Sequence, residues 1–159
     1  MSVLIQGNQV RAISLGIKVS KSTGTLAATT VPLFTIAGGL VLVTSLVGRV
    51  TTAITVANSY KLQHNPTLGT TVDLCTAADL GTTDTAAGTV VGFNNSIDDP
   101  ATTGATFEKK IELGGHLLRD LVVTTGDIEM VVTGTNPDGA ITWYATWVPL
   151  TDGATLVAG

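Results

Sequence analysis

The stretch VPLFTIAGGLVLVTSLVGRV, Val31 to Val50, decides how the rest of the chain is interpreted. Its first 18 residues, Val31 to Gly48, carry no charge, and a run of that length is a candidate for a membrane-spanning helix. The alternative is a pair of buried β-strands. The central pair Gly38-Gly39 is typical of a hairpin turn because glycine accepts positive φ, and the many β-branched residues favour strands. We therefore predict two strands joined by a hairpin, and no membrane helix.

The second half of this stretch continues into a longer strand pattern. Between Leu40 and Val56 the even-numbered positions are mostly apolar, whereas the odd-numbered positions include Ser45 and Arg49. A period of two predicts a long, bent strand with one mostly buried face. Apolar residues also recur every four positions, which an amphipathic helix would share. The high content of β-branched residues favours the strand.

The composition of the whole chain agrees with an all-β fold. The 159 residues are 44% hydrophobic and only 13% charged, and they include 18 glycines. A chain of this length fits one domain, and such a mixture favours pleated sheets and tight turns. We predict an antiparallel β-sandwich, jelly-roll-like fold or β-barrel with at most one short helix.

The chain is expected to divide into an extended N-terminal arm, residues 1–30, and a single β domain, residues 31–159. The arm contains isolated apolar residues among Gly, Ser, Thr and Gln, so we expect it to be ordered mainly by what it contacts. We assign its residues Val10, Arg11 and Ile13 to an interface. The N-terminus lacks the pattern of a secretory signal peptide, which predicts synthesis in the cytoplasm of the producing cell without entry into a secretory pathway.

Several further elements are predicted in the β domain. Tyr60, Leu62 and His64 alternate with polar residues, which indicates a second strand of a meander that ends at Asn65-Pro66 because proline cannot donate to a ladder. The segment VDLCTAADL, residues 72–80, is the candidate for the short helix. Strands separated by turns are expected within residues 88–93, 107–113, 116–124, 127–135 and 140–148.

Two tryptophans lie in the last of these strands. Trp143 and Trp147 fall on one face, and Tyr144 falls on the other. The indoles could pack in the core, anchor a protein interface or stack on sugar rings, and a chain with so few aromatic residues favours the core. We keep Trp143 and Trp147 as candidate interface residues.

Net charge and cysteine content exclude several classes of function. The net charge is -4, and the eight basic residues are scattered, so we expect no nucleic-acid partner. Cys75 is the sole cysteine, which rules out an internal disulfide and a paired-cysteine metal site. We interpret Cys75 as a small buried hydrophobic residue.

No motif in the sequence indicates catalysis. There is no G-x-S-x-G elbow, no H-E-x-x-H pair and no glycine-rich phosphate loop, so we assign no catalytic residue, cofactor or metal ligand and do not expect an enzyme. His64 and His116 are expected to be surface or hydrogen-bonded groups. The pair Asp98-Asp99 is better explained as a solvated turn than as a calcium site, because the alternating oxygen ligands of a calcium loop are missing.

Two stretches resemble structural proteins of tailed-bacteriophage virions. The first is VLVTSLVGRVTTAITVANSYKLQHNPT, residues 41–67, and the second is GDIEMVVTGTNPDGAITWYATWVPLTDGATLVAG, residues 126–159. The resemblance implies a head decoration, or cement, protein that binds the major capsid protein on the outer surface of the virion. It also implies a homo-oligomer, often a trimer, that performs no chemistry and has no catalytic residues.

Three features of the sequence agree with this expectation. Low charge and long apolar strands suggest that the subunit has apolar surface which would be buried when subunits associate. The acidic balance fits a position away from packaged DNA, and the arm fits a segment that latches onto a neighbour.

Two other classes of function stay open at this point. A tail-fibre or receptor-binding module would contact host glycans through loops near Asp84 and Asn95 or through the face that bears Trp143. A small glycan hydrolase would need paired acids, for which Glu108, Glu112 and Glu129 are the candidates.

Overall fold

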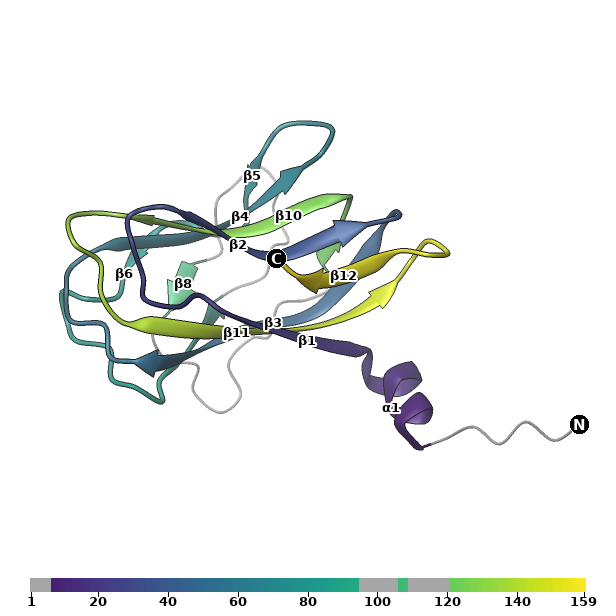
Figure 1. The fold of residues 1–159 in the computed structure, drawn as a ribbon, viewed down its shortest axis with the longest axis horizontal. Helices are drawn as coiled ribbons and strands as arrows, with labels where there is room; N and C mark the ends of the chain where they lie inside the picture. The colour runs from purple at the N-terminus through teal and green to yellow at the C-terminus, as the bar shows by residue number, and fades with distance from the viewer. Residues whose placement is uncertain (1–6, 95–105, 109–120) are drawn as a thin grey trace, which may run out of the picture.

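The computed structural model describes residues 7–94, 106–108 and 121–159. Two antiparallel sheets pack face to face as a sandwich, and one short helix, α1 (Gly7–Leu15), lies beyond one end of it (Figure 1). The prediction of an all-β fold with one short helix is confirmed, and the sheets form a sandwich and not a closed barrel.

The first sheet, called sheet A here, runs in the order β1-β11-β3-β7-β8, and β9 also pairs with β3. Its strands are β1 (Ile17–Ser22), β3 (Val41–Thr52), β7 (Val90–Asn94), β8 (Thr106–Glu108), β9 (Leu121–Val123) and β11 (Ala140–Pro149).

The second sheet, sheet B, runs in the order β12-β2-β10-β4-β5, and β6 also pairs with β4. Its strands are β2 (Thr30–Ala37), β4 (Ser59–Pro66), β5 (Val72–Asp73), β6 (Ala78–Asp79), β10 (Gly126–Thr133) and β12 (Thr155–Ala158). The strands predicted within residues 88–93, 127–135 and 140–148 are present as β7, β10 and β11. The strands predicted at 107–113 and 116–124 lie mostly outside the described residues.

The turn at Gly38-Gly39 exists, but it does not form the predicted hairpin. Both glycines have positive φ, 75° and 140°, as expected for a tight turn. However, β2 belongs to sheet B and β3 to sheet A, so the turn carries the chain from one sheet to the other. A Cβ at Gly38 would lie 2.5 Å from the carbonyl oxygen of Gly153, which explains why no side chain fits there.

Strand β3 is long, as predicted, but it does not keep the one buried face that the period of two predicted, because the buried face changes parity along its length. Val41 and Val43 are buried in its first part, whereas Leu46 and Val50 are buried in its second part. The pairing with β11 shifts register at the same place, where Thr44 has no partner. This β-bulge adds one residue and thereby turns the following side chains to the opposite face.

Strand β4 buries Tyr60, Leu62 and His64 and ends at Pro66, as the alternation predicted. It pairs with β10 of sheet B, whereas the preceding strand β3 belongs to sheet A. The prediction of a meander from β3 into β4 is therefore wrong.

The helix predicted at residues 72–80 is also wrong. This segment contains the short strands β5 and β6, both paired with β4. Between them the backbone N–H of Leu74 donates to the carbonyl of Leu62 at 2.9 Å. Leu74 and Cys75 are buried by this packing on the edge of sheet B and not by a helix.

Helix α1 lies instead in the predicted arm, where the described residues form two structured parts. Residues 7–15 form α1, and β1 follows at Ile17 and pairs along its whole length with β11. The division into an arm, residues 1–30, and a domain, residues 31–159, stays a prediction.

The core lies between the two sheets. Its largest fully buried side chains come from both sheets and from the segments between β3 and β7; they are Trp143, Tyr60, Phe34, Leu33, Leu46, Ile54, Leu62, Leu80, Ile128, Met130 and Ile141. Burial of such side chains contributes about 1.5–3 kcal/mol each to folding. Within the described residues, no helix is long and apolar enough to cross a membrane.

Candidate interaction surface

The helix α1 is joined to the sandwich by a single glycine. Gly16 has a φ of 82° and its N–H donates to the carbonyl of Ala12 at 3.0 Å, which is a left-handed cap that ends the helix. A Cβ at Gly16 would lie 2.8 Å from the carbonyl oxygen of Trp147. The close approach and the positive φ both require glycine, so this junction sets the direction in which α1 leaves β1.

Exposed apolar residues gather at the end of the sandwich where α1 leaves it. Ile17 pairs with Trp147, the N–H of Leu150 donates to the carbonyl of Leu40, and Val122 pairs with Leu42. These pairings place six exposed apolar side chains on α1 and on the adjoining end of sheet A: Val10, Leu15, Ile17, Leu40, Val122 and Leu150. We call this set the apolar end. Apolar side chains that gather on a surface are typical of a contact with another molecule.

A shallow groove of about 350 Å³ runs over the outer face of sheet A beside the apolar end. Tyr144, with 44% of its surface exposed, stands in the groove between Ser20 and Val47, its neighbours on the adjacent strands. The complete lining is Lys18, Val19, Ser20, Ser45, Val47, Tyr144, Ala145 and Thr146. The groove therefore offers an aromatic ring, several hydroxyls and one cation.

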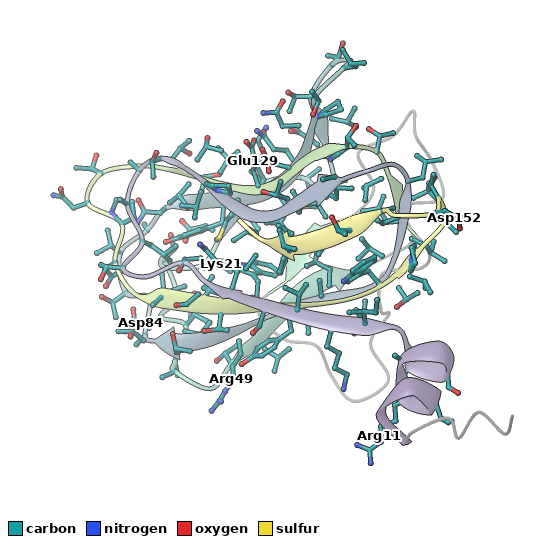
Figure 2. All side chains as sticks on the ribbon, turned by 45° about the vertical axis from the view of Figure 1, so that its right-hand side comes forward. Arg11, Lys21, Arg49, Asp84, Glu129 and Asp152 are labelled. Carbon is teal, nitrogen blue, oxygen red and sulfur yellow. The ribbon has the colours of Figure 1, made fainter. Side chains whose placement is uncertain are left out.

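The two outer faces of the sandwich differ in charge. On sheet A, β1 and β3 contain basic residues but no Asp or Glu, and β11 contains no charged residue. On sheet B, β10 carries Asp127 and Glu129. Arg49 points outward from sheet A and Glu129 points outward from sheet B, on opposite faces of the molecule (Figure 2). Neither residue takes part in the single ion pair among the described residues, which joins Lys61 to Asp73 at 2.7 Å.

The acidic side chains of sheet B are held by neutral donors. The hydroxyl of Thr35 donates to Asp127 at 2.6 Å. The amides of Gln63 and Asn65 donate to the two oxygens of Glu129 at 2.6 and 3.2 Å. These contacts orient the carboxylates without cancelling their charge, so the face remains attractive to a cation.

The residues assigned to an interface from the sequence lie in two different environments. Trp143 and Trp147 are 0% and 5% exposed, so both indoles pack in the core, which was the favoured interpretation. A partner would not reach them while the sheets stay packed, and their role in an interface stays a prediction. Val10 and Arg11 are exposed on α1. Ile13 lies in the same helix.

The other candidate groups have structural surroundings. His64 is buried, with Nδ1 3.2 Å from the carbonyl of Asp127 and Nε2 3.4 Å from the hydroxyl of Thr124. Burial lowers the pKa of its imidazole, and the nearby carbonyl and acidic groups of Asp127 and Glu129 partly oppose this. His64 is thus a hydrogen-bonded core residue. This is one of the two environments, surface or hydrogen-bonded, that the sequence predicted for it.

Cys75 is buried, as predicted, although not in a helix. Burial raises the pKa of its thiol to about 11, and its sulfur accepts a hydrogen bond from the N–H of Leu62 at 3.3 Å. A thiol of this kind is a poor nucleophile because the reactive form is the thiolate.

The paired acids proposed for a glycan hydrolase are only partly described. Glu129 lies on sheet B and Glu108 ends a strand of sheet A. Glu112, His116, Asn95 and the pair Asp98-Asp99 lie outside the described residues. Among the residues that are described, no group of three or more His, Cys, Asp or Glu side chains is arranged to hold a metal ion.

Sequence reasoning placed Tyr144 on the face opposite the tryptophans but missed the groove around it. The alternation in β11 is local, whereas the groove needs β1 and β3 on either side, and these pairings join residues far apart in the chain. The chain matches no protein-family model, no curated protein and no solved structure.

Proposed function

We propose that this chain is a structural protein of a tailed-phage virion, namely a head decoration protein that binds the outer capsid surface as a homo-oligomer, with a trimer as the expected assembly. The observation that carries the proposal is the apolar end, where a helix projects from the sandwich and apolar side chains stay in contact with solvent.

A projecting helix of this size supports a role in association. It has 9 residues, and isolated helices shorter than about 12–15 residues are marginal in water. Leu15 is 62% exposed and Val10 is 49% exposed, so the helix gains little from burial within its own chain. Contact with a neighbour would supply the missing burial.

The rest of the apolar end supports a second contact, with the major capsid protein. Leu40, Val122 and Leu150 lie on the sandwich itself and not on the helix, and all three are exposed. A modest contact per copy becomes durable when an oligomer attaches through several copies at once. In this proposal the shell is stabilised by additive contacts between its subunits and the attached oligomers.

The test uses purified particles with and without the protein. A decoration protein should be present in numbers comparable to the capsid subunits, as counted by quantitative mass spectrometry, and particles that carry it should survive heating or osmotic shock better. Equal survival of the two kinds of particle would argue against the stabilising role.

A surface variant makes the same test specific. The double variant Leu40→Asp/Leu150→Asp should reduce binding to bare particles, because it places charge in the apolar end. The control is Leu68→Asp, which changes an apolar residue that is 89% exposed in the loop between β4 and β5. Equal binding of both variants would remove the apolar end from the proposal.

The groove favours a second candidate, a receptor-binding module of the tail. Its exposed Tyr144 and the hydroxyls of Ser20, Ser45 and Thr146 are groups that stack on and hydrogen-bond to sugars. In this case only a few copies should be present in each particle, and Tyr144→Ala should reduce binding to host glycans. Binding of the Tyr144→Ala variant at the level of the natural chain would argue against it.

A further inference from the structure

One face of α1 combines a cation with a large apolar side chain. Arg11 and Leu15 are four residues apart, so they lie on the same side of the helix with a rise of about 6 Å between them. The side chain of Arg11 points away from both sheets (Figure 2). It has no acidic partner within the described part of the chain.

The outer face of sheet B presents the complementary pair. Glu129 and Val131 are two residues apart on β10 and point to the same side, at a spacing of about 7 Å. Glu129 is held in place by hydrogen bonds from the neutral amides of Gln63 and Asn65. Val131 lines a groove of about 340 Å³ that is formed mostly by polar residues. Its partner on β4 is Lys61, whose charge is paired with Asp73 in the same groove.

We propose that α1 of one copy docks on the outer face of sheet B of a second copy, with Arg11 on Glu129 and Leu15 on Val131. The two pairs match in spacing and in charge, and a guanidinium can donate two parallel hydrogen bonds to one carboxylate. The inference rests on the homo-oligomer of the proposed function and names the surfaces that would build it.

The contact is between copies because of where α1 leaves its own chain. The helix is attached to β1 of sheet A, and Glu129 lies on the opposite face of the sandwich (Figure 2). Gly16, packed against the carbonyl of Trp147, directs the helix away from the sandwich. A contact from the helix of one copy to the sheet of the next is heterologous, so it repeats around a ring when the rotation closes.

The experiment measures association of the full-length chain by native mass spectrometry and by light scattering after size exclusion. Arg11→Glu and Glu129→Arg should each weaken association about tenfold or more, because each places like charges together. The double variant Arg11→Glu/Glu129→Arg should restore it, since the charges are then exchanged and the pair is kept.

Two control variants separate this contact from general charge effects. Lys18→Glu changes the net charge by the same amount as Arg11→Glu but lies in the groove of sheet A. Asp84→Arg makes the same change of charge as Glu129→Arg at an exposed loop position. Both should associate like the natural chain. Thermal unfolding should confirm that the exposed substitution at Arg11 leaves the sandwich folded.

The inference is overturned if the natural chain is monomeric at all concentrations, if Arg11→Glu associates as well as Lys18→Glu, or if the double variant stays dissociated. These results differ from failure of the capsid role. A monomer that still binds particles would refute this contact and leave the decoration role, with a capsid subunit as the partner of α1. An oligomer with the expected charge dependence that does not bind particles would support this contact and refute the decoration role.

Discussion

Gly48 stands directly opposite Trp143 on the neighbouring strand of sheet A, and the indole passes over the position where a side chain at residue 48 would be. A Cβ built there would lie 3.2 Å from the indole, 2.7 Å from Val91 and 2.9 Å from Ile141. The largest side chain of the core is therefore accommodated by the smallest residue on the adjacent strand.

Gly48→Ala is expected to destabilise the fold by about 1–3 kcal/mol, because overpacking forces well-packed neighbours out of their preferred positions. The measurement is the free energy of unfolding in denaturant. Gly7→Ala is the control for the same chemical change, since nothing lies within 4 Å of a Cβ at that position. If the Gly48 variant were as stable as the Gly7 variant, the neighbouring core side chains would be able to repack around the added methyl group without cost.

Asp138 should make stability depend on pH in the acid range. Its carboxylate accepts hydrogen bonds from the hydroxyl of Thr55 at 2.6 Å and from the N–H groups of Thr55 and Val56, and these lower its pKa. A lowered pKa means that the stabilisation is complete above the pKa of the unfolded chain, about 3.9, and is lost as the pH falls through the folded value.

The test compares the natural chain with Asp138→Asn in thermal unfolding. We expect a lower Tm for the variant at pH 7 and a difference that shrinks as the pH falls below the pKa of the unfolded chain and the natural carboxyl becomes protonated. Asp84→Asn, at an exposed loop position, is the control. A difference that does not change with pH would mean that the charge of Asp138 is not what stabilises the loop.

His64 should add a second dependence at higher pH. Burial lowers its pKa, so the unfolded chain binds a proton more readily than the folded chain. Its contribution is therefore complete above about pH 6.5 and is lost as the pH falls through the lower, folded pKa. Between pH 8 and pH 5 the natural chain should lose more stability than His64→Gln in denaturant unfolding. Parallel loss in both chains would assign the effect to another group.

The thiol of Cys75 should report global unfolding. It is 2% exposed, and with a pKa of about 11 only about one thiol in a thousand is ionised at pH 8. Labelling with a thiol reagent should be slow in the native state and fast in denaturant, with a rate that follows the unfolding equilibrium. Rapid labelling under native conditions would show that the edge formed by β5 and β6 opens locally.

The sequence predicted the elements whose pattern is local. The alternation in β4 and β11 identified their buried faces because side chains in a strand point to opposite sides in turn. It also placed Tyr144 outward. The surface around Tyr144 and the partners of α1 were not predictable, because they depend on which distant strands lie next to each other.

The incorrect prediction of a helix at residues 72–80 has the same cause, namely contacts with residues distant in the sequence. Leu74, Cys75 and Leu80 are apolar and buried, a pattern that a helix and an irregular edge share. The backbone bond from Leu74 to Leu62 and the short pairings with β4 decided the outcome. Tertiary contacts overrode a weak local preference.

The sequence by itself determined that the chain turns at Gly38-Gly39 and that both flanking segments are strands, because positive φ and β-branched packing are properties of the residues themselves. Only the tertiary structure decided that these strands enter different sheets. Backbone hydrogen-bond partners are chosen in competition among all strands, and here β10 and β12 take the two edges of β2, while β11 lies beside β3.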